Sequence, residues 1–128
     1  MERRKRILVI DDASLVRLYY RGALERAGFE VAEALNGIEA LEQLLNAPAD
    51  LLIVDVNMPQ MDGLSFLKAL RAKGPPLSST PSLVVSTEGL PDRVSAAHSA
   101  GANLYLVKPV TEETLVQYAR LLCGAPNG

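Results

Sequence analysis

Polar residues that could do chemistry directly follow short apolar runs at four places in the chain. The runs at 7–10, 51–54, 83–85 and 104–107 lead, in that order, into Asp11-Asp12, Asp55, Ser86-Thr87 and Lys108-Pro109. Three carboxylates held close together repel one another, and one lysine cannot offset three negative charges. An oxygen-only donor set of this kind favours a hard cation, Mg²⁺ or Mn²⁺. That chemistry requires a fold that brings the aspartates together.

The four apolar runs are typical of strands buried on both faces, since none of them alternates apolar with polar residues. A fifth run, 29–33, does alternate and predicts an edge strand.

Helical patterns separate these strands, and Ser14 and Thr111 are expected to cap the first and fifth helices. A weaker, Ala-rich fourth helix is expected over 92–100, ending at Gly101. The apolar stripes expected to face the core are Val16, Tyr20, Ala23, Leu24 and Ala27 in the first helix, Ile38, Leu41 and Leu45 in the second, Leu64, Leu67 and Leu70 in the third, and Leu115, Ala119 and Leu122 in the fifth.

Five strand–helix units in alternation predict an α/β fold, a doubly wound parallel sheet with helices on both faces. In such sheets ligands bind beyond the carboxyl ends of the strands, where the strand order reverses. With the flavodoxin-like strand order 2-1-3-4-5, the first and third strands are neighbours. The carboxylates of Asp11, Asp12 and Asp55 then converge at one edge of the sheet.

Length and composition predict one globular domain over 1–128, with a core of about 5–123 and a flexible tail at 124–128. The net charge of -2 argues against direct nucleic-acid binding. The single cysteine, Cys123, excludes a cysteine-based zinc site, and the single histidine, His98, argues against histidine-based metal or triad chemistry. No apolar run reaches the roughly 18 residues of a membrane span, so we expect no membrane insertion and a cytoplasmic location.

The motifs around these residues resemble those of CheY-like response regulator receiver domains of two-component signal transduction. The resemblance covers about 5–122. It rests on 11–14 with Arg17, 55–59 with 61–64, 86–88, 100–102 and 108–109. It implies a flavodoxin-like (βα)5 fold with strand order 2-1-3-4-5.

Carried over by position, the resemblance implies a phosphoacceptor, Asp55, that takes a phosphoryl group from a phosphohistidine of a sensor histidine kinase or phosphotransfer protein. It implies Mg²⁺ bound directly by Asp12, mainly through water by Asp11, and by Asp55 and the backbone carbonyl of Asn57. Lys108 would pair with Asp55 and then with the phosphoryl group. The chain would catalyse only its own phosphorylation and dephosphorylation, and would not otherwise be an enzyme.

The resemblance also implies a switch made of Ser86, which contacts the phosphoryl group, and Tyr105. The Lys108–Pro109 peptide is expected to be cis. Asn57 and Glu88 are expected to set the lifetime of the phosphoryl group. The output face would comprise the fourth helix, fifth strand and fifth helix, including Val94, Tyr105 and Tyr118, and would bind a target protein or a second copy of the domain. Receiver domains commonly dock their kinases with the first helix, which gives its off-stripe residues Leu15 and Leu18 a possible docking role.

Three other functions remain as alternatives. A haloacid-dehalogenase-like phosphatase also phosphorylates a strand-end aspartate, but wants a second acid two residues later, where this chain has Asn57. A flavodoxin-like cofactor binder needs a phosphate-cradling loop after the first strand, where Asp11-Asp12 would repel phosphate. A degenerate receiver, acting as a phosphorylation-independent binding module, would not need the intact acidic set, Ser86 and Lys108.

Overall fold

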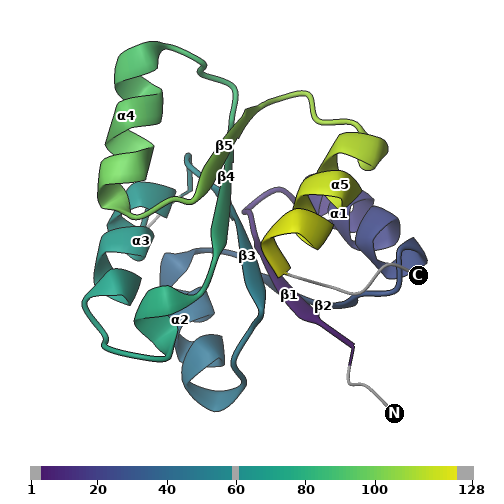
Figure 1. Cartoon of the computed structure of the whole chain (residues 1–128), viewed down its shortest axis with the longest axis horizontal. Coiled ribbons are helices and arrows are strands. Elements are labelled where there is room, and N and C mark those ends of the chain that lie inside the picture. Colours follow the sequence, from purple (N-terminus) through teal and green to yellow (C-terminus); the bar gives the residue numbers. More distant parts are fainter. Residues whose placement is uncertain (1–3, 59–60, 124–128) are drawn as a thin grey trace.

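Within the described residues, the chain forms one parallel five-stranded sheet in the order β2-β1-β3-β4-β5, and five α-helices cover its two faces (Figure 1). The computed structural model describes residues 4–58 and 61–123. Pro59 of the recognised motif and the expected tail at 124–128 lie outside the described residues. The elements are β1 (Arg6–Ile10), α1 (Ser14–Arg26), β2 (Glu30–Ala34), α2 (Gly37–Asn46), β3 (Leu51–Asp55), α3 (Gly63–Arg71), the 3₁₀ helix η1 (Leu77–Ser79), β4 (Ser82–Ser86), α4 (Pro91–Ala100), β5 (Leu104–Val107) and α5 (Glu112–Cys123).

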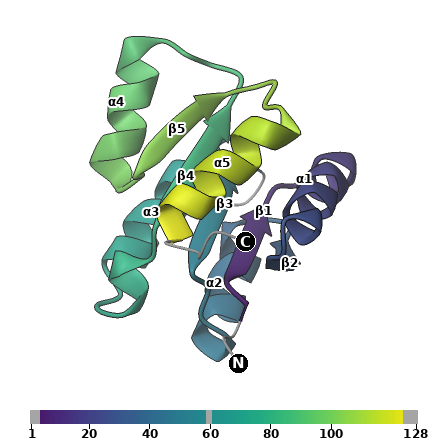
Figure 2. The ribbon, with the colours of Figure 1, turned by 45° about the vertical axis from the view of Figure 1, so that its right-hand side comes forward.

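The helices cover the sheet in two layers, because neighbouring residues of each strand point to opposite faces. In β1, Leu8 and Ile10 belong to a core cluster with residues of α2, α3 and α4, whereas Ile7 and Val9 belong to a second cluster with residues of α1 and α5. Figure 2 shows α1 and α5 together on one side of the sheet. The predicted fold class and strand order are therefore confirmed.

Two strand predictions have different outcomes. The continuous apolar runs in β1, β3 and β4 are buried as predicted, and β2 is an edge strand. The prediction that 104–107 is buried on both faces is wrong, because β5 is the other edge of the sheet and Val107 is 46% exposed.

The predicted core stripe of α2 is right for Leu41, which packs against the core, and wrong for the other two residues. Ile38 and Leu45 are 44% and 66% exposed, whereas Ala40 and Leu44 are buried. At this position α2 closely approaches α3 and the loop before it: a Cβ built at Gly37 would lie 2.9 Å from Phe66 Cβ in α3 and 2.8 Å from Met61 Cγ. The buried face of α2 therefore comprises Gly37, Ala40 and Leu44, and Ile38 and Leu45 are left outside.

Of the two predicted helix caps, the one at α5 is confirmed and the one at α1 is wrong. Thr111 Oγ1 accepts a hydrogen bond from the Thr114 N–H at 3.1 Å, as expected of a cap. Ser14 is not the cap of α1: it is the first helical residue, and Ala13 precedes it without a side-chain cap. The Ala13 N–H donates instead to Asp11 Oδ1 at 2.9 Å, so the loop is ordered by an acid of the predicted site.

Arg71, at the end of α3, joins three segments at the edge of the sheet opposite the strand-end acids. Its guanidinium donates to the backbone carbonyls of Ser78, Thr80 and Gly101 at 3.1, 2.7 and 2.6 Å. The burial of this side chain lowers the pKa of Arg71. One side chain therefore connects η1, the approach to β4 and the end of α4.

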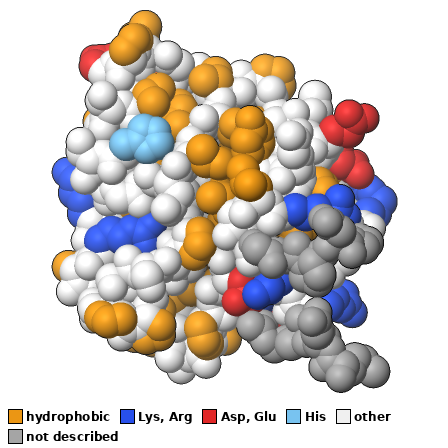
Figure 3. All heavy atoms as spheres, in the orientation of Figure 1, with side chains coloured by type: hydrophobic (Ala, Val, Ile, Leu, Met, Phe, Trp, Pro, Cys, Tyr) orange, Lys and Arg blue, Asp and Glu red, His pale blue; other side chains and the backbone are white. Residues whose placement is uncertain are grey.

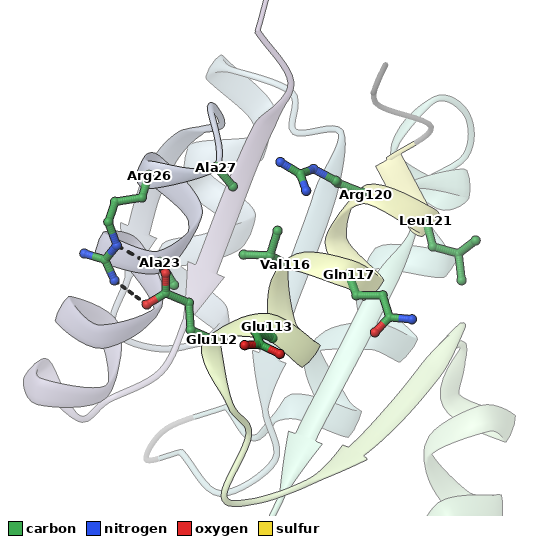
Figure 4. A pocket seen from close by; sticks show the side chains of 9 residues that line it. All are labelled: Ala23, Arg26, Ala27, Glu112, Glu113, Val116, Gln117, Arg120 and Leu121. Carbon is green, nitrogen blue, oxygen red and sulfur yellow. Dashed lines mark hydrogen bonds and ion pairs between the residues drawn. The ribbon is translucent and has the colours of Figure 1, made fainter. Parts of the chain in front are cut away.

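The outer surface includes a groove of about 770 Å³ between α1 and α5 (Figure 4). Arg26 Nε donates to Glu112 Oε2 at 3.2 Å across it, and its floor includes Ala23 and Val116. His98 is exposed, as Figure 3 also shows, in agreement with the absence of a role for it in the predicted site. Within 4–58 and 61–123, no helix is long and apolar enough to cross a membrane.

Candidate functional site

The three predicted acids come together at the carboxyl edge of the sheet. Asp11 and Asp12 follow β1, and Asp55 ends β3, which pairs with β1. Each of the three offers a carboxylate oxygen, and these oxygens lie within 4.8 Å of one another. Asp11 and Asp55 are 2% and 7% exposed, whereas Asp12 is open to solvent. Two buried acids and one accessible acid therefore share one small volume.

Lys108 is the cation of this cluster. Its Nζ lies 3.2 Å from Asp55 Oδ1 and 3.7 Å from Asp11 Oδ2. Burial raises the pKa of Asp55 above its usual range, the negative charge of Asp11 raises it further, and the charge of Lys108 opposes both. One lysine thus offsets the acidic charge incompletely, as the sequence predicted.

The donor set fits a hard divalent cation. Asp11 Oδ2 is buried and accepts no hydrogen bond from any described residue, although the other oxygen of that carboxylate receives the Ala13 N–H. A buried carboxylate oxygen without a donor is costly unless a charged partner satisfies it. With oxygen-only ligands, Mg²⁺ or Mn²⁺ is the cation favoured by this chemistry. Asn57 is exposed beside the cluster, and its carbonyl as a ligand stays a prediction.

Asp55 is held in place by the start of α3. The Gly63 N–H donates to the Val56 carbonyl at 3.0 Å. A Cβ built at Gly63 would overlap the Asp55 carbonyl oxygen and would lie 3.0 Å from Val54 Cγ1. The first turn of α3 can therefore pack directly on the strand end that carries Asp55 only because this residue is glycine. Gly63 stands in one of the motifs recognised in the sequence, but no sequence signal indicated this packing role.

The two predicted switch residues both contact the backbone of Glu88. Ser86, 1% exposed, accepts the Glu88 N–H on its Oγ at 3.1 Å. The Tyr105 hydroxyl donates to the Glu88 carbonyl. The loop after β4 therefore lies between the two side chains. The Lys108–Pro109 peptide is cis, as the resemblance implied.

Two residues of α1 belong to the surroundings of the acids, although the sequence analysis gave them no role there. Arg17 Nη1 donates to the Asp11 carbonyl at 2.6 Å. Burial, and after it the negative charges of Asp11 and Asp55, raise the pKa of Tyr20 to about 12. Helical spacing alone marked Tyr20 as a core residue, and no sequence signal showed that it lies beside the acids.

An apolar hollow of about 510 Å³ adjoins the site between α1 and the segment after β5. Leu15, one of its lining residues, is 78% exposed. Its other lining residues are Val16, Tyr19, Tyr20, Thr87, Lys108, Pro109 and Val110. Because Lys108 belongs to both the hollow and the acidic cluster, a molecule seated in the hollow would lie next to Asp55.

Residues 7–120 match the family model of the response regulator receiver domain, and the chain belongs to this family of CheY-like receivers in two-component signalling. It is 40% identical over 121 residues to the chemotaxis protein CheY1 of Helicobacter pylori (strain J99), covering 93% of this chain and 97% of the relative. It is 38% identical over 125 residues to the CheY homolog of Campylobacter jejuni, covering 96% and 95%.

Solved structures agree with this assignment. The chemotaxis protein CheY4 of Vibrio cholerae superposes with a TM-score of 0.88 at 36% identity, covering 94% of this chain and 99% of that one. A response regulator of Chloroflexus aurantiacus gives a TM-score of 0.90 at 32% identity, covering 96% and 100%. Family membership favours a receiver over the phosphatase and cofactor-binding alternatives.

Proposed function

We propose that Asp55 accepts a phosphoryl group from a phosphohistidine of a sensor histidine kinase or phosphotransfer protein, in a reaction that depends on Mg²⁺. The observation that carries this proposal is the convergence of Asp11, Asp12 and Asp55 on one volume, with Lys108 at 3.2 Å from Asp55. Sharing of these motifs with the receiver family supports it.

The chemistry follows from the charges. An Asp55 carboxylate oxygen forms a bond to phosphorus while the phosphorus–nitrogen bond of the donor breaks, and the imidazole nitrogen keeps the electron pair. Lys108 faces the nucleophile and neutralises charge on the phosphoryl oxygens as it develops. Asp11, Asp12, Asp55 and the Asn57 carbonyl would hold Mg²⁺, which supplies charge neutralisation and orientation of the phosphoryl oxygens when bound. On this proposal the chain turns over no substrate beyond its own phosphoryl group.

The hollow beside the site suits the donor protein. Its exposed apolar side chains, Leu15 above all, fit an apolar helix of a kinase or phosphotransfer protein, and it extends to Lys108. A phosphohistidine on such a helix would then be presented to Asp55 at the edge of the hollow. Water would later attack the phosphoryl group past the exposed residues Asn57 and Glu88, which leave room for it.

The proposed output signal passes through the loop after β4, which carries Glu88 and contacts both Ser86 and Tyr105. A phosphoryl oxygen on Asp55 would accept a charge-assisted hydrogen bond from the Ser86 hydroxyl and draw this residue inward. Because Glu88 bonds both Ser86 and Tyr105, the movement would reach β5 and the start of α4. The α4–β5–α5 face, with Val94, Tyr105 and Tyr118, would then bind a target protein or a second copy.

Phosphorylation is tested by incubating the chain with acetyl phosphate and Mg²⁺ and measuring the intact mass. We expect one added phosphoryl group in the wild type and in Asp92→Asn, which removes an exposed aspartate outside the cluster, and none in Asp55→Asn. Omission of the metal should abolish the labelling. Equal labelling of Asp55→Asn would refute the phosphoacceptor, and an unlabelled wild type would favour the phosphorylation-independent binding module.

The switch is tested by amide chemical shifts with and without beryllofluoride, a phosphoryl mimic. We expect changes at Ser86 and Glu88 that continue through 90–107. Changes confined to the immediate neighbours of Asp55 would contradict the output mechanism.

A further inference from the structure

Arg17 connects the acidic loop to the rest of the fold through two of its nitrogens. Its Nη1 donates to the Asp11 backbone carbonyl at 2.6 Å, and its Nε donates to Glu33 Oε1 on β2 at 2.8 Å. The side chain is 12% exposed, so it is held among protein groups rather than in water. Glu33 is held in turn by Arg21, whose Nη1 lies 2.5 Å from Glu33 Oε2.

With the hydrogen bond from Arg17, every polar group of Asp11 except one has a hydrogen-bond partner. The Asp11 N–H donates to the Ala34 carbonyl at 3.1 Å, and Asp11 Oδ1 accepts the Ala13 N–H. The oxygen left over is Oδ2, which lies in the acidic cluster and accepts no hydrogen bond from the described residues. Arg17 therefore holds the backbone of the residue whose Oδ2 lies in the acidic cluster, 3.7 Å from Lys108 Nζ.

We propose that Arg17 is a positioning residue, which holds the Asp11-Asp12 loop in the geometry that binds the divalent cation. This role rests on the proposed function, since it assumes that the acids bind Mg²⁺. Arg17 acts through Asp11 and needs no contact with the cation or with the phosphoryl group. The guanidinium suits this task because its planar nitrogens can bind a carbonyl and a carboxylate at once, which an ammonium group cannot do in the same geometry.

The charge of Arg17 and its positioning have opposite effects on Mg²⁺ affinity, so they can be separated. If Arg17 acted through its positive charge alone, its removal would make the acidic site more attractive to Mg²⁺. If it acts by holding the loop, its removal loosens two ligands and weakens binding. Partners that orient metal ligands are typically worth about 10- to 100-fold in affinity when they are removed.

The experiment is a calorimetric titration of the apo-protein with MgCl₂ for the wild type, Arg17→Gln, Arg17→Lys and Arg21→Gln. We expect about tenfold weaker binding in both Arg17 variants, because lysine keeps the charge but not the two-nitrogen bridge. Arg21→Gln is the matched control: it removes a cation that pairs with the same Glu33 but, among the described residues, donates no hydrogen bond to Asp11, and its affinity should stay within about twofold of the wild type.

A second measurement does not depend on the metal. In chelator, the Ala13 amide, which donates to Asp11 Oδ1, should exchange with solvent faster in Arg17→Gln than in the wild type. The core amides of β1 serve as the reference for global stability. Faster exchange of all amides alike would indicate general destabilisation and would refute a local role.

The outcomes separate the two levels of the proposal. A wild type that binds no Mg²⁺ overturns the metal site and this role with it. A wild type that binds Mg²⁺, with Arg17→Gln and Arg17→Lys unchanged or Arg17→Gln tighter, overturns the positioning role alone. Equal weakening in Arg21→Gln would overturn the role of the bond to Asp11, because that variant keeps this bond and loses only a partner of Glu33.

Discussion

Gly63→Ala tests whether α3 sets the position of the phosphoacceptor. The added Cβ would overlap the Asp55 carbonyl oxygen, and it would lie 3.0 Å from Val54 Cγ1 and 3.1 Å from the Asp55 carbonyl carbon. Carbon–carbon contacts are optimal at about 3.5–4.0 Å, so several contacts are short at once. All five residues of β3 are buried between β1 and β4, so the strand end has little freedom to retreat.

Overpacking of a buried site costs about 1–3 kcal/mol, and we expect the upper end here because backbone atoms must move. Urea unfolding followed by circular dichroism should show a loss of about 3 kcal/mol, with a melting temperature lower by about 10 °C. Labelling by acetyl phosphate should slow in the folded fraction, because the α3 start and Asp55 must separate.

Gly22→Ala is the matched control for this substitution. Gly22 lies inside α1, and its added Cβ would meet at 3.2 Å only the guanidinium end of Arg26, which can move. Alanine in a helix interior is favoured over glycine by about 0.5–1 kcal/mol, so this variant should be as stable as the wild type or more so. Wild-type stability and labelling in Gly63→Ala would refute the account of how Asp55 is positioned.

Three further predictions concern stability and reactivity. In chelator, Asp11→Asn should raise the free energy of unfolding by about 1–2 kcal/mol, because a buried, incompletely compensated charge is removed. In excess Mg²⁺, the free energy of unfolding of this variant should instead be lower than that of the wild type. Equal unfolding curves in chelator would contradict this prediction. Thr111→Ala should cost about 1 kcal/mol, whereas Ser14→Ala, which removes no cap, should stay within about 0.5 kcal/mol in the same urea assay. Burial raises the pKa of Cys123 to about 11, so the neutral thiol favours the folded state below the unfolded pKa and this stability is lost as the pH rises through the folded value. Iodoacetamide should therefore alkylate folded Cys123 at pH 8 at least about tenfold more slowly than unfolded Cys123, and equal rates would count against the burial.

The sequence was sufficient for the sheet and for the side chains at its carboxyl edge. Short apolar runs with no polar alternation predicted β1, β3 and β4. The polar residues that follow these strands lie at the carboxyl edge, where a parallel sheet must place them. The convergence of Asp11 and Asp55 followed from strand order, which came from the resemblance and not from periodicity.

The errors lie where packing between elements overrides local pattern. In α2, the apolar stripe through Ile38 and Leu45 has helical spacing, but the close approach of Gly37 to α3 turns the face with Ala40 and Leu44 inward. Similarly, Ser14 has the side chain of a cap, but it is the first helical residue, and Ala13 occupies the cap position without a side-chain hydrogen bond. Arg17 and Gly63 stood in recognised motifs, and their contacts could be seen only once the segments that they join were placed together.

Arg71 has a consequence for how the loops of this protein can be changed by engineering. Its acceptors at Ser78, Thr80 and Gly101 are carbonyl oxygens, which every amino acid carries. Ser78 and Ser79 can therefore be substituted without removing a hydrogen-bond partner of the guanidinium, as long as the backbone conformation is kept. Spectroscopic labels or short recognition tags placed at Ser79, an exposed residue, would report on the molecule while η1 stays anchored to α3.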